Sequence, residues 1–229
     1  TKIGTFFQMI DQLITVNERK VKNLKLMKKS LLQKMFPKDG SEYPELRFPE
    51  YTDAWVKHEL GELGETFNGL SGKKKEDFGH GKARFVTYMN VFSNTVASEK
   101  MVEAVEIDNR QHEIKRGDVF FTTSSETPEE VGMSSVWVFD KANYYLNSFT
   151  FGYRPAVDFD LSYLAFMLRS ESVRKDIKLL AQGISRFNIS KVKMMKIGVP
   201  VPDKDEQTKI GAFFKNLDQL ITVNERELL

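Results

Sequence analysis

The sequence contains no cysteine and only three histidines among its 229 residues. The absence of cysteine excludes a disulfide scaffold, a thiol nucleophile and a cysteine-ligated zinc site. The histidines, His58, His80 and His112, are far apart and lack the spacing of metal ligands. No apolar run approaches the ~18–20 residues that span a bilayer, so we expect no membrane partner. The absence of cysteine fits the expected cytoplasmic location, although many exported proteins also lack cysteine. The net charge is only +2, so any affinity for nucleic acid depends on local clusters of charge.

Two segments near the ends of the sequence are almost identical. Residues 1–19 recur at 208–226 with only four differences, an offset of 207 residues. Apolar residues in these copies recur with a period of seven, which predicts long helices that pack lengthwise on another helix. The predicted packing positions are Ile3, Phe6, Ile10, Leu13, Asn17, Leu24, Met27 and Leu31 in the first copy, and Ile210, Phe213, Leu217, Leu220 and Asn224 in the second. Asn17 and Asn224 either fix the register inside this seam or face solvent at its edge.

Prolines, glycines and capping residues divide the chain into four parts. We predict a long helix over 1–36, a linker over 37–54, a domain over 55–202 and the start of a second helix over 203–229. The second helix should begin near Lys204, because Asp203 and Glu206 have the spacing of a capping box. The first and last residues then lie inside helices, which suggests one period of a larger duplicated protein.

The segment 55–202 has the pattern of an α+β domain with mostly antiparallel strands. Apolar runs predict strands at 83–91, 102–107, 118–123, 135–139, 148–153 and 196–201. Asp160 can cap a helix that continues or restarts through residues 173–180, and Gly183 is its expected C-cap. A further short helical turn is predicted within 188–195.

The sequence offers little for catalysis. Residues 69–73 (Gly-Leu-Ser-Gly-Lys) resemble a P-loop, but two residues separate the glycines instead of four, and Lys74 stands where Ser or Thr would bind magnesium. No Gly-x-Ser-x-Gly elbow is present. Asp203 and Glu206 resemble part of a nuclease motif, but helix capping explains them better. We therefore expect no catalytic residue, metal site or cofactor in this chain.

Three polar segments remain as a candidate binding surface. They are the basic loop 68–75, the hydroxyl-rich segment 122–125 and the segment 183–193. Loops that combine Arg or Lys with Ser, Thr and Asn can contact both the phosphates and the base edges of double-stranded DNA. Taken singly, each segment could instead be an ordinary solvated loop, and for the lysine run this is the more common case.

Together these features resemble the specificity subunits of type I restriction-modification systems. The resemblance rests on residues 206–221, on 24–36 with the ending Lys-Lys-Ser-Leu-Leu-Gln-Lys-Met-Phe, and on 55–61, 68–69, 183–190 and 200–202. It implies two DNA-recognition domains that alternate with two helical regions packed as an antiparallel coiled coil. Each domain would read one half of a bipartite site. This chain would be half of such a subunit, and a homodimer would restore two recognition domains.

The resemblance also assigns the chemistry to partners. Modification subunits would bind S-adenosylmethionine and methylate adenine, and restriction subunits would use ATP and Mg to translocate and cut DNA. We thus predict a non-enzymatic DNA-recognition subunit whose helices dock the modification subunits. The alternatives are a helical assembly scaffold without DNA readout, and a type II-like enzyme with a fused domain. The predicted DNA-contacting residues are Asn68, Ser71, Lys73, Lys74, Lys75, Tyr88, Thr122, Ser124, Ser125, Arg154, Ser185, Arg186, Asn188, Lys191 and Lys193, although Tyr88 fits the core equally well.

Overall fold

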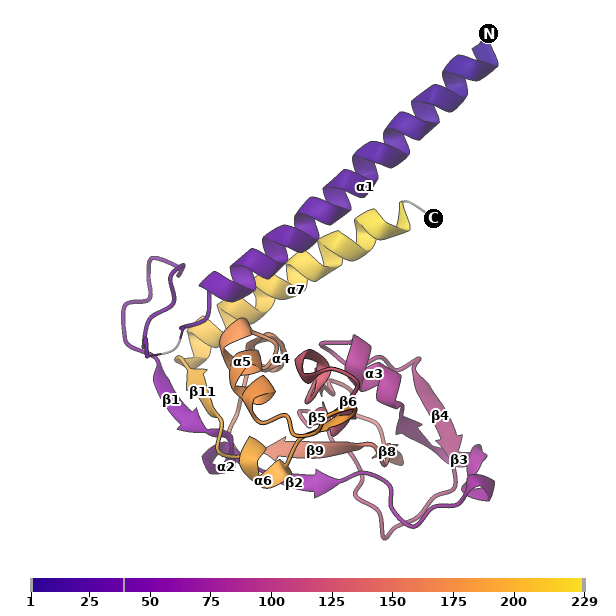
Figure 1. Ribbon diagram of the computed structural model, residues 1–229, viewed down its shortest axis with the longest axis vertical. Helices are drawn as coiled ribbons and strands as arrows, with labels where there is room; N and C mark the ends of the chain where they lie inside the picture. The colour runs from indigo at the N-terminus through magenta and orange to yellow at the C-terminus, as the bar shows by residue number, and fades with distance from the viewer. Residues whose placement is uncertain (1, 39, 228–229) are drawn as a thin grey trace.

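Two long helices, α1 (Lys2–Lys34) and α7 (Lys204–Arg226), lie side by side and project from one end of a mixed α/β domain (Figure 1). The computed structural model describes residues 2–38 and 40–227, so Thr1 of the predicted first helix lies outside it. The helices are antiparallel, and ion pairs join Lys25 to Glu225 at 2.6 Å and Lys28 to Asp218 at 2.5 Å. The N-terminal half of α1 extends beyond the end of α7 (Figure 1).

The first turn of α7 is fixed by two acidic side chains with different partners. Asp203 accepts a hydrogen bond from the backbone N–H of Glu206 at 2.8 Å, as the capping pattern predicts. The Glu206 carboxylate does not complete the capping box by accepting from the backbone N–H of Asp203. It is fully buried and accepts hydrogen bonds from Arg47 Nε and Nη2, both at 2.8 Å, and from Trp55 Nε1 at 3.0 Å. This network holds the linker and the start of the domain against α7.

The strands form four small sheets. The largest is antiparallel, in the order β2 (Gly64–Asn68), β9 (Thr150–Pro155), β5 (Val119–Thr122) and β7 (Ser134–Val136). A second has the order β4 (Val102–Val105), β3 (Phe78–Val86) and β8 (Tyr144–Leu146), and its β3–β8 pair is parallel. Two antiparallel pairs complete the set: β1 (Val56–Glu59) with β11 (Gly198–Val201), and β6 (Ser124–Ser125) with β10 (Phe187–Asn188).

Short helices connect these strands. They are α2 (Leu60–Leu63), α3 (Tyr88–Ser93), α4 (Leu161–Met167), α5 (Glu171–Leu179) and α6 (Lys191–Met194), with 3-10 turns η1 (Lys75–Asp77) and η2 (Pro128–Glu130). α4 begins as predicted after Asp160, whose Oδ1 accepts a hydrogen bond from Tyr163 N–H at 2.8 Å. α4 packs against α7 and so couples the domain to the helix pair.

Aromatic side chains fill the junction between the helices and the domain. The ring of Phe36 lies 6.2 Å from Trp55, 5.8 Å from Tyr163 and 6.0 Å from Phe214, measured between centroids. All four side chains are buried. Burial of each such side chain contributes about 1.5–3 kcal/mol, so this cluster anchors the direction in which both helices leave the domain.

The predicted mixed α/β class is confirmed, and two local predictions are wrong. The strand predicted at 83–91 ends at Val86, and α3 follows, because the Thr87 hydroxyl caps it by accepting from Asn90 N–H at 3.2 Å. Gly183 is not a C-cap, since α5 ends at Leu179. The other predicted strands overlap β4, β5, β7, β9 and β11, whereas β1, β2, β6, β8 and β10 were missed.

Candidate nucleic-acid interface

Two of the three predicted binding segments lie together. β6 pairs with β10, with Ser124 opposite Asn188 and Ser125 opposite Phe187. The pairing continues where Ile189 N–H donates to the Thr123 carbonyl at 3.0 Å. The hydroxyl-rich segment 122–125 is therefore joined to the segment 183–193, although about 60 residues separate them in sequence.

Tyr88 and Asn68 complete this surface from other elements. The Tyr88 hydroxyl donates to the Ser124 carbonyl at 2.8 Å, and its ring stacks on Phe92 with a centroid distance of 6.0 Å. Burial raises the pKa of the Tyr88 phenol above its usual value, and the nearby positive charge of Arg186 offsets only a small part of this shift. At the end of β2, the Asn68 side-chain oxygen accepts a hydrogen bond from Lys191 Nζ. Tyr88 thus supports β6 as a half-buried side chain rather than projecting from the surface.

The buried hydroxyls of this region are structural. Thr122 is fully buried, and its Oγ1 accepts a hydrogen bond from Met133 N–H at 2.9 Å. Ser125 is also buried, and its hydroxyl donates to the Thr127 carbonyl. Ser124 is buried as well. These three side chains lie beneath the surface and position β6, and their contact with DNA stays a prediction that this burial does not favour.

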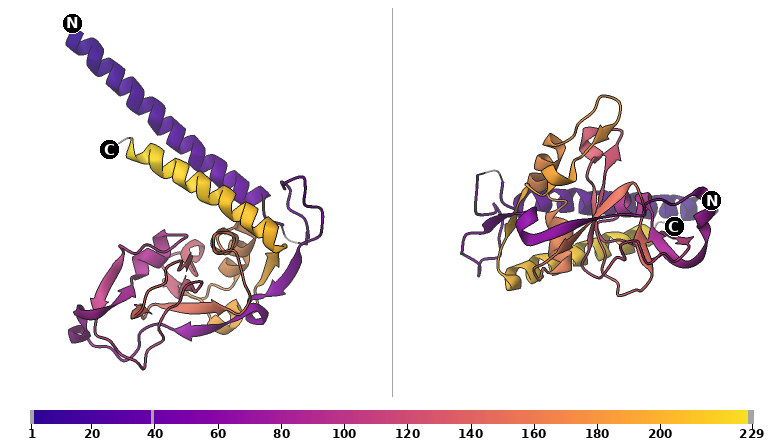
Figure 2. Two further views of the ribbon diagram at one scale, coloured as in Figure 1. Left: turned by 180° about the vertical axis from the view of Figure 1, so that it is seen from behind. Right: turned by 90° about the horizontal axis from the view of Figure 1, so that it is seen from below.

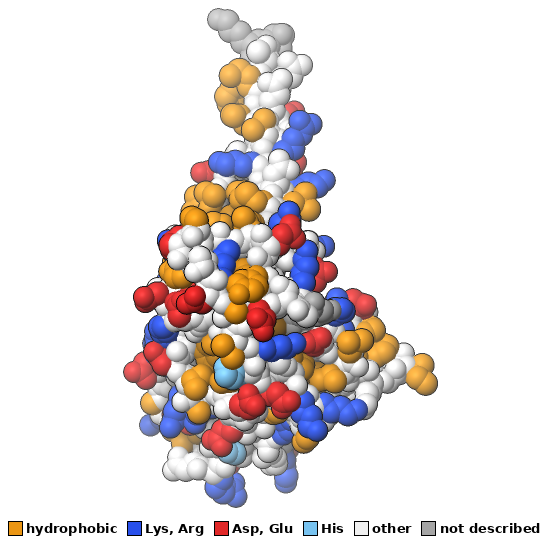
Figure 3. Space-filling model, turned by 90° about the vertical axis from the view of Figure 1, so that its left-hand side faces the viewer, with side chains coloured by type: hydrophobic (Ala, Val, Ile, Leu, Met, Phe, Trp, Pro, Cys, Tyr) orange, Lys and Arg blue, Asp and Glu red, His pale blue; other side chains and the backbone are white. Residues whose placement is uncertain are grey.

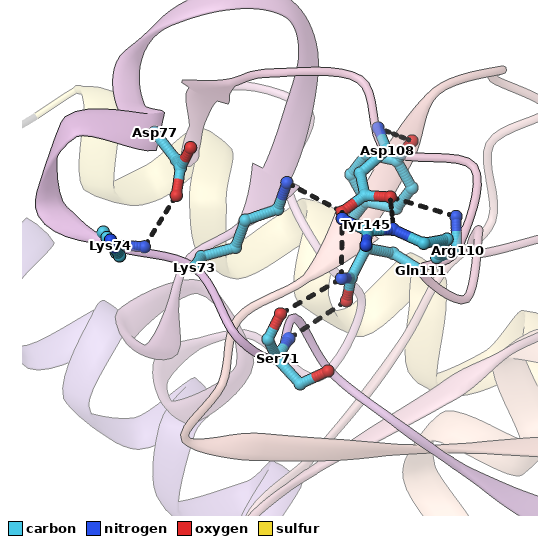
Figure 4. A network of polar contacts seen from close by, with 8 residues as sticks. All are labelled: Ser71, Lys73, Lys74, Asp77, Asp108, Arg110, Gln111 and Tyr145. Atoms are coloured by element: carbon cyan, nitrogen blue, oxygen red, sulfur yellow. Dashed lines mark hydrogen bonds and ion pairs between the residues drawn. The ribbon is translucent and has the colours of Figure 1, made fainter.

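Lys73 belongs to a network that closes the basic loop 68–75 (Figure 4). Its Nζ lies 3.0 Å from Asp108 Oδ2, and its side chain is 11% exposed. Hydrogen bonds from Arg110 and from Lys73 hold the pKa of Asp108 below its usual value. Beside this ion pair, Gln111 accepts from Ser71 N–H at 3.0 Å and donates to the Ser71 carbonyl at 3.1 Å. Lys73 thus holds two loops together, whereas Lys74 and Lys75 are exposed.

Arg154 has a structural position in a different part of the domain. Its guanidinium makes two hydrogen bonds to the buried Asp118, at 2.8 and 2.7 Å, and a third to the Glu113 carbonyl at 3.0 Å. The hydrogen bonds to Asp118 raise the pKa of Arg154. Arg154 lines a cleft of ≈1680 Å³ between the domain and the helix pair, together with Lys28 and Lys215. Arg154 thus has a structural partner in Asp118, and its contact with DNA stays a prediction.

Solvent-facing side chains remain around the β6–β10 pair. We call the following set the recognition surface: Asn68, Ser185, Arg186, Asn188, Lys191 and Lys193. All are exposed except Lys191, which is half-buried. Phe149, an exposed aromatic whose carbonyl accepts from the Thr123 hydroxyl at 2.8 Å, lies beside it and was missed. Its sequence neighbours resemble an ordinary strand, so no local signal marks it.

The buried face of α7 differs slightly from the predicted seam. It consists of Ile210, Phe214, Leu217, Ile221 and Asn224, together with polar residues of the first turn. Leu220, predicted in the seam, is 45% exposed, and Phe213 is half-buried against Phe48. The buried positions keep the seven-residue repeat, but Phe214 and Ile221 take the places that the prediction gave to Phe213 and Leu220. Asn224 lies inside the interface and not at its solvent edge.

The repeated residues of α1 have a different environment. Of the predicted seam, Ile3, Phe6, Leu13 and Met27 are exposed, and Ile10, Asn17, Leu24 and Leu31 are half-buried. Ile3 is 71% exposed and Phe7 59%, although the matching residues of the repeat, Ile210 and Phe214, are buried. Figure 3 shows apolar side chains along this projecting part of α1. The face that α7 buries is therefore open in the N-terminal half of α1.

Comparison with known proteins places this architecture in a family. The model of the type I restriction modification DNA specificity domain matches residues 52–229. The chain is 22% identical, over 99% of its length and 55% of the relative's, to the type I restriction enzyme MjaVIII specificity subunit of Methanocaldococcus jannaschii. Because the family match covers most of the chain, the chain belongs to the family of type I restriction-modification DNA specificity domains.

Solved structures share this fold. The HsdS subunit from Thermoanaerobacter tengcongensis superimposes with a TM-score of 0.67 at 16% identity, over 100% of this chain and 51% of that one. The type I restriction-modification S subunit from M. genitalium gives a TM-score of 0.53 at 16% identity, over 76% of this chain and 41% of that one. The chain thus spans about half the length of these relatives.

Two further features of the described residues bear on the function. No helix within residues 2–38 and 40–227 is long and apolar enough to cross a membrane. In the same residues, no group of three or more His, Asp or Glu side chains is placed to hold a metal ion. The site that the structure does present is a surface of cations, amides and hydroxyls.

Proposed function

We propose that this chain reads one half of a bipartite double-stranded DNA site through the recognition surface. The observation that carries the proposal is the charge of the segment that forms it. Residues 177–202 contain five Lys or Arg residues and no Asp or Glu, and the β6–β10 pair exposes the middle of this segment. Arg and Lys can hold phosphates or guanine edges, and Asn188 can contact adenine or a phosphate. The exposed Lys74 and Lys75 would extend the contact along the DNA backbone.

The helix pair would dock modification subunits and set the spacing between half-sites. Support comes from the repeat: α7 buries Phe214 and Ile221, while the matching Phe7 and Ile14 of α1 are exposed. A contiguous apolar face left exposed on a protein commonly marks an interaction surface. We propose that it packs in a coiled coil in the assembled complex, and that a homodimer of this chain would supply a second recognition domain for a palindromic bipartite site.

The chain would perform no chemistry itself. S-adenosylmethionine would bind to the modification subunits, and ATP and Mg to the restriction subunits. Support comes from the family, in which the specificity subunit selects the DNA sequence, and from the structural roles of Tyr88, Arg154 and Asp118. The isolated chain is expected to show neither methyl transfer nor DNA cleavage, and either activity would contradict the proposal.

The test is a reconstituted complex with its modification subunit. Methylome sequencing of cells that carry both chains identifies the recognised motif, and footprinting on that motif should show protection by the domain. Arg186→Ala should lower the affinity by about 1–3 kcal/mol if Arg186 reads a base, with relaxed specificity at one position. Lys100→Ala, which removes one exposed positive charge outside the surface, is the matched control.

The competing function is an assembly scaffold without DNA readout, favoured by the exposed face of α1. It predicts that the complex forms, that Arg186→Ala binds DNA as the wild type does, and that residues 55–202 give no footprint. Protection by the domain together with loss of affinity in Arg186→Ala excludes the scaffold.

A further inference from the structure

The connection between α5 and α6 carries an apolar side chain at its tip. Ile184 is 97% exposed, which means that the rest of the described chain covers almost none of it. The right panel of Figure 2 shows this orange connection protruding beyond the domain. An isoleucine in this position gains nothing for the fold of the domain, because it buries no apolar surface.

The loop that presents Ile184 is closed at its base. Gln182 and Asn188 exchange two backbone hydrogen bonds, Asn188 N–H to the Gln182 carbonyl at 2.8 Å and Gln182 N–H to the Asn188 carbonyl at 3.0 Å. Gly183 has φ +142°, and a Cβ there would lie 2.0 Å from the Arg186 carbonyl oxygen. The turn is thus tighter than any other residue would permit, and it directs Ile184 outward from the β6–β10 pair.

The surroundings of Ile184 favour a polyanionic partner. Ser185 and Arg186 follow it and are exposed, and Lys191 and Lys193 come after β10. The nearest acidic residue before Ile184 in the sequence is Asp176, and the nearest one after it is Asp203. In a protein–protein interface, an apolar anchor is commonly surrounded by further contacts that exclude water. The sequence neighbours of Ile184 are glycine, serine and arginine, which do not form such an apolar surrounding. Cations beside one apolar side chain suit a DNA groove.

We propose that Ile184 is a wedge that inserts at a base step of the recognised DNA and partly unstacks it. The inference rests on the proposed DNA-reading function and adds the mode of contact. Apolar side chains inserted in this way kink the duplex, and the energy of unstacking depends on the step, being lowest at flexible pyrimidine–purine steps. Ile184 thereby contributes to specificity through the deformability of the DNA. Ser185 and Arg186 then lie beside the inserted side chain, where Arg186 can hold a phosphate or a base edge.

The test uses the full chain assembled with its modification subunit and a duplex that carries the methylome-defined motif. 2-Aminopurine is placed at successive positions, and its fluorescence rises where a base loses its stacking partner. A rise is expected at the target adenine, which the methyltransferase flips out of the stack, and the wild-type complex should give a second rise at one further step. Ile184→Ala should abolish it and lower the affinity for the motif about tenfold, with the salt dependence unchanged, because no charge is removed. Ile184→Leu should retain most of the signal.

Two controls separate this contact from other roles. Val56→Ala removes a 56% exposed apolar side chain from β1, outside the segment 183–193, and should leave both fluorescence and affinity unchanged. Arg186→Ala should lower the salt slope by about one if Arg186 holds a phosphate. Wild-type fluorescence and affinity in Ile184→Ala would overturn the wedge while leaving the DNA-reading function intact. If Ile184→Ala weakens binding of the modification subunit and leaves the fluorescence unchanged, the wedge is likewise overturned and the DNA-reading function stays intact. Failure of the wild-type complex to select any sequence would overturn both.

Discussion

Removal of the buried Glu206 carboxylate should destabilise the chain more than any surface substitution. In Glu206→Ala, Arg47 loses both acceptors of its 2.8 Å hydrogen bonds, and Trp55 Nε1 loses its acceptor at 3.0 Å. The Arg47 side chain is largely buried, so water cannot replace the carboxylate fully. Breaking a buried pair by removing one partner costs about 3–5 kcal/mol, and we expect Glu206→Ala to lower the free energy of unfolding by that amount.

Chemical denaturation followed by tryptophan fluorescence measures this effect, because Trp55 is one of only two tryptophans and lies in the network. The double variant Arg47→Met with Glu206→Leu should recover most of the loss, since it leaves no uncompensated charge. The double-mutant cycle then isolates the coupling between the two side chains. A loss below about 1 kcal/mol in Glu206→Ala, or a double variant as unstable as the single one, would refute the reasoning.

Three further predictions follow from other contacts. Because the pKa of Asp108 is lowered in the fold, its ion pair contributes its full stabilisation above pH ~3.8, the value in the unfolded chain, and this contribution declines as the pH falls from there through the lower pKa of the folded chain. The melting temperature of Asp108→Asn should therefore be lower than that of the wild type at pH 7, and the gap should narrow on acidification below pH 4. Gly183→Ala should distort the tip of the α5–α6 loop and weaken binding to the motif. The melting temperature of the domain should not change, because the loop is exposed. If the variant binds the motif as well as the wild type does, the tight turn is dispensable. Asn224→Leu should raise the melting temperature of the isolated chain. The buried Oδ1 of Asn224 has no hydrogen-bond partner among the described residues, an arrangement that costs about 1–3 kcal/mol. A lower melting temperature in the variant would mean that packing at this position requires the amide.

Local chemistry in the sequence was sufficient to locate the long helices. The cap at Asp203 and the repeat at 208–226 predicted α7 to within a residue of its start, because capping and heptad spacing depend on neighbours a few residues away. The strand error at Tyr88 has the opposite cause. Aromatic and β-branched residues follow Thr87, which favours a strand, but the Thr87 cap and burial of Val91 make this segment helical.

The candidate surface was predictable in part. The basic character of residues 183–193 is visible in sequence, and the structure exposes Arg186 and Lys193 there. Burial of Thr122 and pairing of Lys73 with Asp108 depend on contacts between segments far apart in the chain. The local sequence around a serine or lysine is the same whether its side chain faces solvent or bonds to another loop. Composition alone therefore could not distinguish these structural residues from the solvent-facing ones.

The antiparallel pairing of β1 with β11 has a consequence for how such a chain diversifies. Val56 lies opposite Val201, so the polypeptide enters and leaves the domain at neighbouring points. A domain whose ends adjoin can be exchanged as a cassette without displacing what flanks it. We therefore expect that another domain grafted between the linker and Pro202 would inherit the same helix pair and bring a new sequence preference, provided that it retains partners for Glu206 and Phe36.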